Sequence, residues 1–222
     1  MDTQLCVDVC RVQDREVSCA PRTNGMDVRV AGVLSYLEQV ASTREKASIE
    51  HLELLAGATQ KSGRLTLESG LGFNHLTACP CVQQTFKHSL GEKGRRLLDE
   101  MLDQGLPALT HSQRCRTTVT ISGAEPPPLA EFLECIDQVV VRCHNTMPRE
   151  LELLTVYRTH ARPQFVEDAL RDLLRAVHER IGSSHPAATI TIRATSMESI
   201  HDFDISGEIT CSVAELDRMF ST

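Results

Sequence analysis

The sequence predicts an α+β protein in which residues 64–213 run strand, strand, helix, helix, strand, strand. Two observations support this order. Apolar residues change from alternate spacing to helical spacing and back again, and glycine or proline residues mark the joins. A unit of this kind packs helices on one face of its sheet and leaves the other face free for assembly. We therefore expect an oligomer.

Four segments carry the strand pattern. After Gly63, the residues Leu65, Leu67 and Leu71 alternate with polar residues, which predicts a long strand that runs toward Leu76. The second strand is predicted at 116–122 and ends before the prolines of 126–128, which force a turn. The last two strands are predicted at 188–196 and 204–213.

Two amphipathic helices are predicted between these strand pairs. Apolar residues recur at helical spacing from Leu129 to Val140, and again from a start at Pro163 to a stop at Gly182. Residues 84–109 look like an insertion between the first two strands. Its charged run at 92–105 predicts a helix with a solvated face.

Residues 1–60 are predicted to form an N-terminal module, followed by the main domain at 61–222. Short apolar runs predict a strand pair within 4–20. Apolar residues at helical spacing predict one helix over 26–40 and a second over 48–55.

The composition narrows the classes of partner. The 222 residues carry 30 acidic and 23 basic side chains, a net charge of -7, without a long basic block. We therefore expect neither nucleic acid nor an anionic membrane as a partner. The sequence lacks the roughly 18 to 20 apolar residues of a membrane span and begins without a signal-peptide pattern, which predicts a cytoplasmic protein.

The nine cysteines do not suggest a disulfide framework, because their number is odd and no spacing repeats. Most are expected to be reduced thiols that pack as small hydrophobic side chains. Cys79 and Cys81 stand apart, because Pro80 between them fixes the backbone at the end of a predicted strand.

Several polar groups are candidates for chemistry. His111, Gln113 and Arg114 lie in the segment THSQR, immediately before a strand, where loops present functional groups. Glu150 and Glu152 precede an apolar run, and Glu167 falls in a predicted first helical turn, where an acid also stabilises the helix dipole. Residues 197–204 place His201 among carboxylates, either as an acid or base or as part of a surface turn.

Together these groups supply thiolate, imidazole and carboxylate, a set that suits Zn²⁺, Fe²⁺ or Mn²⁺. A catalytic metal needs about three protein ligands and an open position for water. Cys79, His111 and one glutamate would provide that arrangement.

Five segments resemble GTP cyclohydrolase IB, and most closely its archaeal-type branch. They are LTACPCVQ at 76–83, THSQR at 110–114, RELE at 149–152, RPQFVED at 162–168 and MESIH at 197–201. The resemblance covers residues 64–210 and implies a tunnelling fold, a homotetramer with active sites between subunits, and GTP as substrate. It implies hydrolysis of the guanine imidazole ring with release of formate, the first step of pterin synthesis.

The resemblance also implies roles for single residues. Cys79 matches the catalytic, metal-ligating cysteine, and His111 and Glu152 match the other ligands of one divalent ion per subunit, Fe²⁺ first, with Mn²⁺ or Zn²⁺ as alternatives. Glu167 matches the carboxylate that holds the guanine edge, with Gln113 and Arg114 as further substrate contacts. Glu198 and His201 match the catalytic acid/base segment.

The sequence departs from the family at several positions. Ser112 replaces the asparagine of H-N-Q-R, RELE replaces R-P-D-E, Phe203 stands where a second histidine is usual, and the N-terminal module is short. The sequence therefore leaves two possible products, 7,8-dihydroneopterin triphosphate and its 2',3'-cyclic phosphate. Two other functions also stay open: another purine- or pterin-handling tunnelling-fold enzyme, and a non-catalytic purine-binding paralogue.

Overall fold

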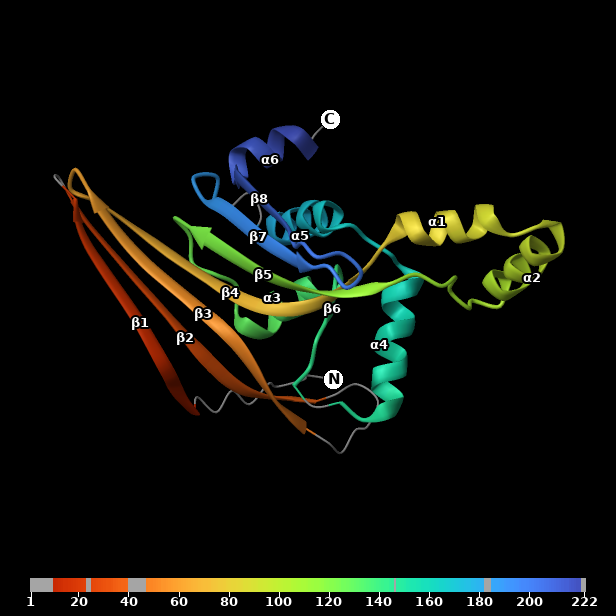
Figure 1. The fold of residues 1–222 in the computed structure, drawn as a ribbon. Helices are drawn as coiled ribbons and strands as arrows, with labels where there is room; N and C mark the ends of the chain where they lie inside the picture. The colour runs from red at the N-terminus through yellow and green to blue at the C-terminus, as the bar shows by residue number, and fades with distance from the viewer. Residues whose placement is uncertain (1–9, 23–24, 40–46, 146, 182–184, 221–222) are drawn as a thin grey trace.

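The structure is a computed structural model that describes residues 10–22, 25–39, 47–145, 147–181 and 185–220. It is an α+β protein built around one long, curved, antiparallel sheet, as Figure 1 shows. The strands follow one another in the order β1-β2-β3-β4-β5-β7-β8, and the short β6 pairs with β4. They are β1 (Cys10–Arg22), β2 (Gly25–Gln39), β3 (Ala47–Lys61), β4 (Arg64–Ala78), β5 (Ser112–Ser122), β6 (Val141–Arg142), β7 (Thr189–Met197) and β8 (Ile205–Ser212).

The C-terminal half has the predicted order of strand, strand, helix, helix, strand, strand. Here β4 and β5 precede helices α3 (Leu129–Asp137) and α5 (Val166–Ile181), and β7 and β8 follow them. On α5, Leu173 and Val177 are fully buried at helical spacing and belong to one core with Ile190 and Ile192 of β7. Each such aliphatic side chain contributes about 2 kcal/mol when buried.

Three elements of this half were not predicted. They are α4 (Arg149–Ala161), α6 (Val213–Phe220) and β6. The buried face of α4 consists of Leu151, Thr155 and Thr159, so two of its three inward positions are polar and the apolar period is weak. Helix α6 has only eight residues, of which Val213 and Leu216 are buried.

The predicted start of α5 at Pro163 is wrong, because the helix begins at Val166. Gln164 instead forms an isolated antiparallel bridge with Ala78 at the end of β4. The Asp168 carboxylate accepts a hydrogen bond from the Phe165 N–H, which satisfies one of the free donors at the helix start.

The two helices predicted in the N-terminal module are also wrong, because both segments are strands. β2 and β3 pair through fifteen consecutive positions, from Gly25 with Lys61 to Gln39 with Ala47. Along β2 the side chains of Leu34 and Tyr36 are buried whereas Val33 and Leu37 are exposed, which is the alternation of a strand. A helix was predicted because apolar residues from both faces of the strand happen to recur at helical spacing. Of the predicted strand pair at 4–20, residues 4–9 lie outside the described part, and the rest belongs to the single strand β1.

The sheet continues across the predicted domain boundary at residues 60 and 61. β3 and β4 join through Ser62 and Gly63, both with positive φ, in the two-residue turn typical of hairpins, and Lys61 pairs with Arg64. Whether the two halves form separate domains stays a prediction.

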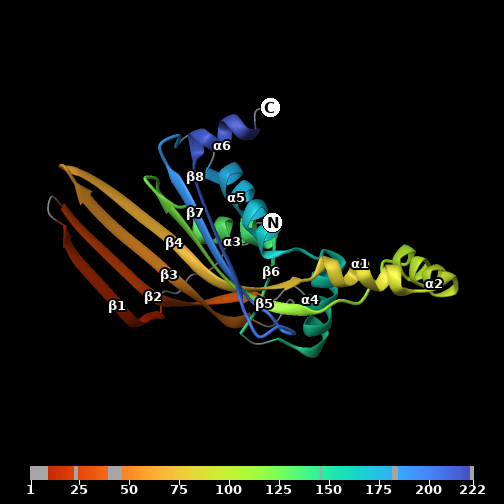
Figure 2. The same cartoon turned by 45° about the horizontal axis from the view of Figure 1, so that its top comes forward.

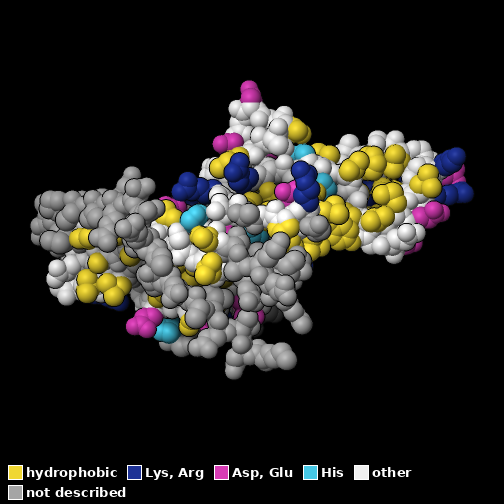
Figure 3. All heavy atoms as spheres, turned by 90° about the horizontal axis from the view of Figure 1, so that it is seen from below, with side chains coloured by type: hydrophobic (Ala, Val, Ile, Leu, Met, Phe, Trp, Pro, Cys, Tyr) yellow, Lys and Arg dark blue, Asp and Glu magenta, His cyan; other side chains and the backbone are white. Residues whose placement is uncertain are grey.

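The predicted insertion forms an arm that projects from the end of β4. It consists of α1 (Pro80–Ser89) and α2 (Glu92–Asp103), and both views of the ribbon place it away from the sheet (Figures 1 and 2). Figure 3 shows hydrophobic side chains on this arm, and charged ones at its tip. Within the described residues, no helix combines the length and apolar character needed to cross a bilayer.

His75 is a polar group in the interior of the sheet. It is fully buried on β4, where its Nε2 lies 2.9 Å from the Thr117 hydroxyl of β5. Burial lowers the pKa of His75 to about 4. The imidazole is therefore neutral in the folded protein near neutral pH.

We expect His75 to make the protein less stable in mild acid. Its pKa is about 6.5 in the unfolded chain, so between pH 6.5 and 4 the unfolded chain binds a proton that the folded protein does not. Between pH 7 and 5 this should remove about 2 kcal/mol from the free energy of unfolding. Urea unfolding at both pH values should show a smaller loss for His75→Gln than for wild type, and equal losses would contradict the prediction.

Candidate functional site

Cys79 lies where strand β4 changes into helix α1. Its backbone is extended, and Pro80 occupies the first helical position, where the missing N–H costs nothing. The Cys79 N–H donates to the His111 carbonyl at 3.2 Å, and the Thr110 hydroxyl donates to the Cys79 carbonyl at 2.6 Å. The predicted cysteine and histidine segments are therefore held together at the backbone.

The segment after β7 reaches the same place. The His111 Nδ1 lies 3.3 Å from the Ser199 hydroxyl. The neighbouring Glu198 accepts a hydrogen bond of 2.8 Å from the hydroxyl of Ser196. His201 is exposed and stacks on Phe203, with ring centroids 5.0 Å apart. Of the three predicted catalytic residues, Cys79 thus contacts His111 through the backbone, and Glu198 is the chain neighbour of Ser199, which contacts the His111 ring.

The end of α4 and the start of α5 complete this region. His160, near the end of α4, places its Nε2 2.7 Å from the Ser112 hydroxyl. Burial lowers the pKa of His160, so the neutral imidazole is favoured. The bridge between Ala78 and Gln164 brings the start of α5 beside β4. Glu167 is therefore an exposed carboxylate in the first turn of a helix that begins close to Cys79.

Gln113 and Arg114 point to opposite faces of the sheet. They are consecutive residues of β5, and successive side chains of a strand alternate. Gln113 is buried, and its side-chain oxygen has no hydrogen-bond partner within the described residues. Arg114 is exposed. One ligand on one face of the sheet cannot contact both side chains along the strand.

Glu152 is separated along α4 from His160, the residue of that helix that contacts Ser112 beside His111. It is exposed in the first half of α4, eight residues before His160, or about 12 Å along the helix axis. In the described part of the chain, no three His, Cys, Asp or Glu side chains are grouped closely enough to hold a metal ion. Thiolate and imidazole are ligand types that a borderline metal accepts, but among the residues that the structure describes no third such side chain joins Cys79 and His111.

Two further residues of this region were not predicted from sequence. The Gln83 amide donates to the carbonyls of Ala108 and His160, both at 3.1 Å, and so joins α1, the end of the arm and α4. His160 itself had no motif to distinguish it. Its role in the fold depends on α4, which the sequence pattern did not reveal.

Comparison with known proteins identifies the family. The sequence model for type I GTP cyclohydrolase folE2 matches residues 22–206. A GTP cyclohydrolase MptA of Halobacterium salinarum is 29% identical over 74% of this chain and 56% of its own length. The corresponding protein of Methanocaldococcus jannaschii is 31% identical over 64% of this chain and 48% of its own. This chain thus spans about half the length of these two relatives.

A further relative aligns over nearly the whole chain. GTP cyclohydrolase MptA 1 of Methanocella arvoryzae is 26% identical across 96% of this chain and 70% of its own length. The family match includes every segment that meets around Cys79 and His111. This protein is therefore a member of the type I GTP cyclohydrolase folE2 family.

Proposed function

We propose that this protein is a GTP cyclohydrolase that opens the guanine imidazole ring of GTP and releases formate, giving 7,8-dihydroneopterin triphosphate or its 2',3'-cyclic phosphate. The main support is the meeting of three segments at Cys79, His111 and Ser199 in a member of this family. A thiol, an imidazole and a nearby carboxylate, Glu198, supply the groups that hydrolysis of an amidine carbon requires.

Glu167 is the proposed anchor of the guanine base. A carboxylate can accept two hydrogen bonds, from guanine N1–H and the exocyclic amine, a pattern that adenine does not offer. Its place in the first turn of α5 sets this carboxylate at the positive end of the helix dipole. Arg114 is the proposed partner of the triphosphate, because it is exposed and permanently charged. Gln113, which is buried, would act by supporting β5 from the opposite face of the sheet.

Glu198 and His201 are proposed to move protons during ring opening and loss of formate. Glu198 is fixed by the Ser196 hydroxyl, whereas exposed His201 is oriented by its stacking on Phe203. Because Phe203 covers one face of the His201 ring, the other face is accessible to a ligand.

The proposal includes one divalent metal ion per subunit, with Cys79 and His111 as two of its ligands. Fe²⁺ is the first choice, and Mn²⁺ and Zn²⁺ are the alternatives. The ion would lower the pKa of a bound water and so supply the nucleophile. Glu152 remains the proposed third ligand. Because it lies about 12 Å along α4 from His160, the set would close only if assembly or ligand binding brought a carboxylate to the pair.

Assembly into a tetramer of tunnelling-fold subunits is part of the same proposal. Leu65 and Leu67 of β4 are 62% and 58% exposed, and Leu109 at the base of the arm is 69% exposed. Apolar groups in this number on one subunit favour contact between copies.

We expect the purified protein, incubated with GTP and Fe²⁺ or Mn²⁺, to form a pterin that fluoresces after oxidation and dephosphorylation. Cys79→Ala should remove both bound metal and turnover, because the thiolate is a ligand. Cys81→Ala is the matched control and should keep both, since Cys81 is an exposed residue of α1. Elemental analysis and fluorescence would measure the two effects. Metal-free protein that stays inactive on reconstitution would argue for a non-catalytic paralogue.

We expect Glu167→Gln to keep the fold but to lower kcat/KM for GTP by roughly tenfold to a hundredfold or more. The amide would place a donor against guanine donors, whereas loss of a helix-start charge alone costs at most about 1 kcal/mol of stability. Glu179→Gln, near the other end of α5, should leave kcat/KM unchanged. Wild-type kinetics for Glu167→Gln would assign that residue to the helix dipole alone.

A further inference from the structure

The imidazole of His160 links the end of α4 to the start of β5. His160 is half-buried, and its Nε2 lies 2.7 Å from the hydroxyl of Ser112. Ser112 is the first residue of β5 and follows directly after His111. A side chain of α4 therefore holds the residue next to one of the two groups at the centre of the candidate site.

The start of β5 has less backbone support than the rest of the strand. From Arg114 onward β5 pairs with both β4 and β7, whereas Ser112 and Gln113 pair with β4 alone in the described part of the chain. Ser112 opposite Ala78 is the last pair of that ladder. Strand ends with few partners open more readily than strand centres. The contact with His160 thus supports the strand where its backbone pairing is weakest.

The end of α4 is itself fixed by other contacts. The carbonyl of His160 accepts a hydrogen bond of 3.1 Å from the Gln83 amide of α1. The hydroxyl of Tyr157, one turn earlier, donates to the carbonyl of Gly105 just after α2. These contacts hold the backbone that carries the His160 ring. A fixed side chain of this kind can in turn fix the position of a neighbour.

The segment that His160 supports also carries the backbone contacts of the candidate site. The His111 carbonyl accepts a hydrogen bond of 3.2 Å from the Cys79 N–H, and the Thr110 hydroxyl donates to the Cys79 carbonyl at 2.6 Å. His111 and Ser112 are adjacent in the chain. A displacement of Ser112 would therefore change the position of His111 relative to Cys79.

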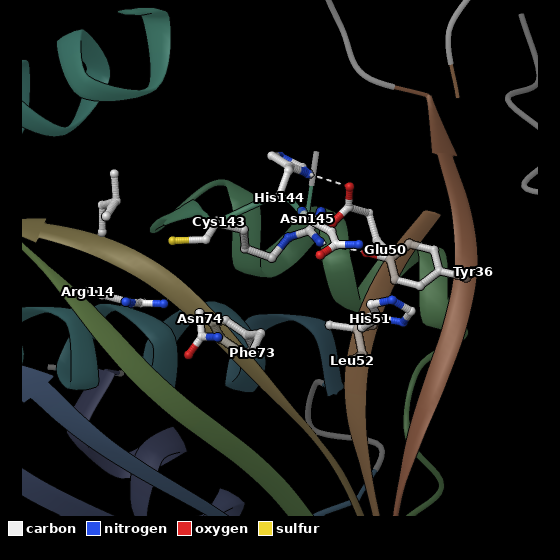
Figure 4. Close-up of a pocket in the computed structure, with 12 residues that line it drawn as sticks. Tyr36, Glu50, His51, Leu52, Phe73, Asn74, Arg114, Cys143, His144 and Asn145 are labelled. Atoms are coloured by element: carbon white, nitrogen blue, oxygen red, sulfur yellow. Dashed lines mark hydrogen bonds and ion pairs between the residues drawn. The ribbon is translucent and has the colours of Figure 1, made fainter. Parts of the chain in front are cut away.

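His160 acts from the face of the sheet that carries Arg114. Ser112 and Arg114 are two residues apart on β5, so their side chains point to the same face. Figure 4 shows Arg114 at one end of a pocket of about 420 Å³, with Glu50 and His144 at the other end. His160 does not line this pocket. Removing the His160 contact should therefore leave Arg114, the proposed partner of the triphosphate, in place.

We propose that His160 is a positioning residue of the proposed reaction, and that it acts by holding Ser112 so that His111 stays beside Cys79. The inference rests on the proposed function, which puts Cys79 and His111 at the reaction centre. A misplacement of about 1 Å can lower the rate of an enzyme by up to about a hundredfold, although every reacting group is still present. Loss of the His160 contact should therefore lower kcat more than it changes KM for GTP.

The test compares two substitutions of His160 in the full chain. His160→Phe keeps an aromatic ring but removes the contact, and it should lower kcat for GTP about tenfold while KM changes by less than about twofold. His160→Gln, whose amide can still bond to the Ser112 hydroxyl, should recover most of the lost kcat. If circular dichroism shows that His160→Phe does not fold, Ser112→Ala removes the same contact and should give the same loss.

Hydrogen exchange gives a second readout that does not depend on turnover. The Cys79 amide is bonded to the His111 carbonyl, so it should exchange about tenfold faster in His160→Phe than in wild type. The amides in the centre of β5, which is paired on both sides, should exchange at the wild-type rate.

His178→Phe is the matched control, because it also removes a hydrogen bond made by a histidine. The His178 Nε2 lies 2.8 Å from the Asp217 carboxylate, and His178 is in the last turn of α5, whereas Glu167 is in the first. This variant should lower the thermal midpoint but keep the wild-type kcat and the wild-type exchange rate of the Cys79 amide.

The proposal is overturned if His160→Phe keeps the wild-type kcat or the wild-type exchange rate at Cys79. It is also overturned if His160→Gln loses as much kcat as His160→Phe, or if His178→Phe lowers kcat by the same factor. A wild-type protein that does not turn over GTP would instead contradict the proposed function. The exchange rate of the Cys79 amide would then decide alone whether His160 holds the His111 segment.

Discussion

The buried guanidinium of Arg142 connects parts of the fold that are distant in sequence. It is 4% exposed and is held by Tyr36 and Glu38 of β2 and by Asp137 at the end of α3. Burial alone would raise the pKa of Glu38, but the hydrogen bonds and charge of Arg142 lower it, so the pair stays ionised. The strand β6 has only two residues, so its pairing with β4 alone fixes it weakly. Removing the arginine would leave the carboxylates of Glu38 and Asp137 without their cation.

The sequence patterns identified the C-terminal half of the fold because burial there is one-sided. In β7 the residues Ile190, Ile192 and Ala194 are buried and alternate with more exposed ones, so the period is clear. β2 and β3 carry apolar residues on both faces, among them Leu34 and exposed Leu37. Over such a short window helical and alternate spacing select overlapping residues, and only the pairing of the two strands with each other decides between them.

The sequence indicated which segments form the candidate site, but it did not indicate the directions in which their side chains point. The Cys79 and His111 segments meet through a backbone hydrogen bond, and His111 contacts Ser199, the neighbour of Glu198. The contact of Ser112 with His160 depends on where α4 ends, which no apolar period indicated. A linear motif also gave no warning that Gln113 and Arg114 point to opposite faces, because that follows from the strand geometry of the segment. Glu152 matched by position alone, and its place on α4 separates it from the pair.

The tight turn at Ser62 and Gly63 has a practical consequence for dissecting this protein. It looks like a natural place to cut, since the two residues are exposed and the sequence changes character there. A fragment that began after the turn would nevertheless lack β3, and nine positions of β4, from Arg64 to Gly72, would lose their paired strand. The newly bared edge would present a row of unpaired backbone groups together with exposed Leu65 and Leu67, the features of an aggregating strand. Circular permutation at this turn, which severs the chain but keeps both strands, is the gentler way to probe whether the two halves fold as one.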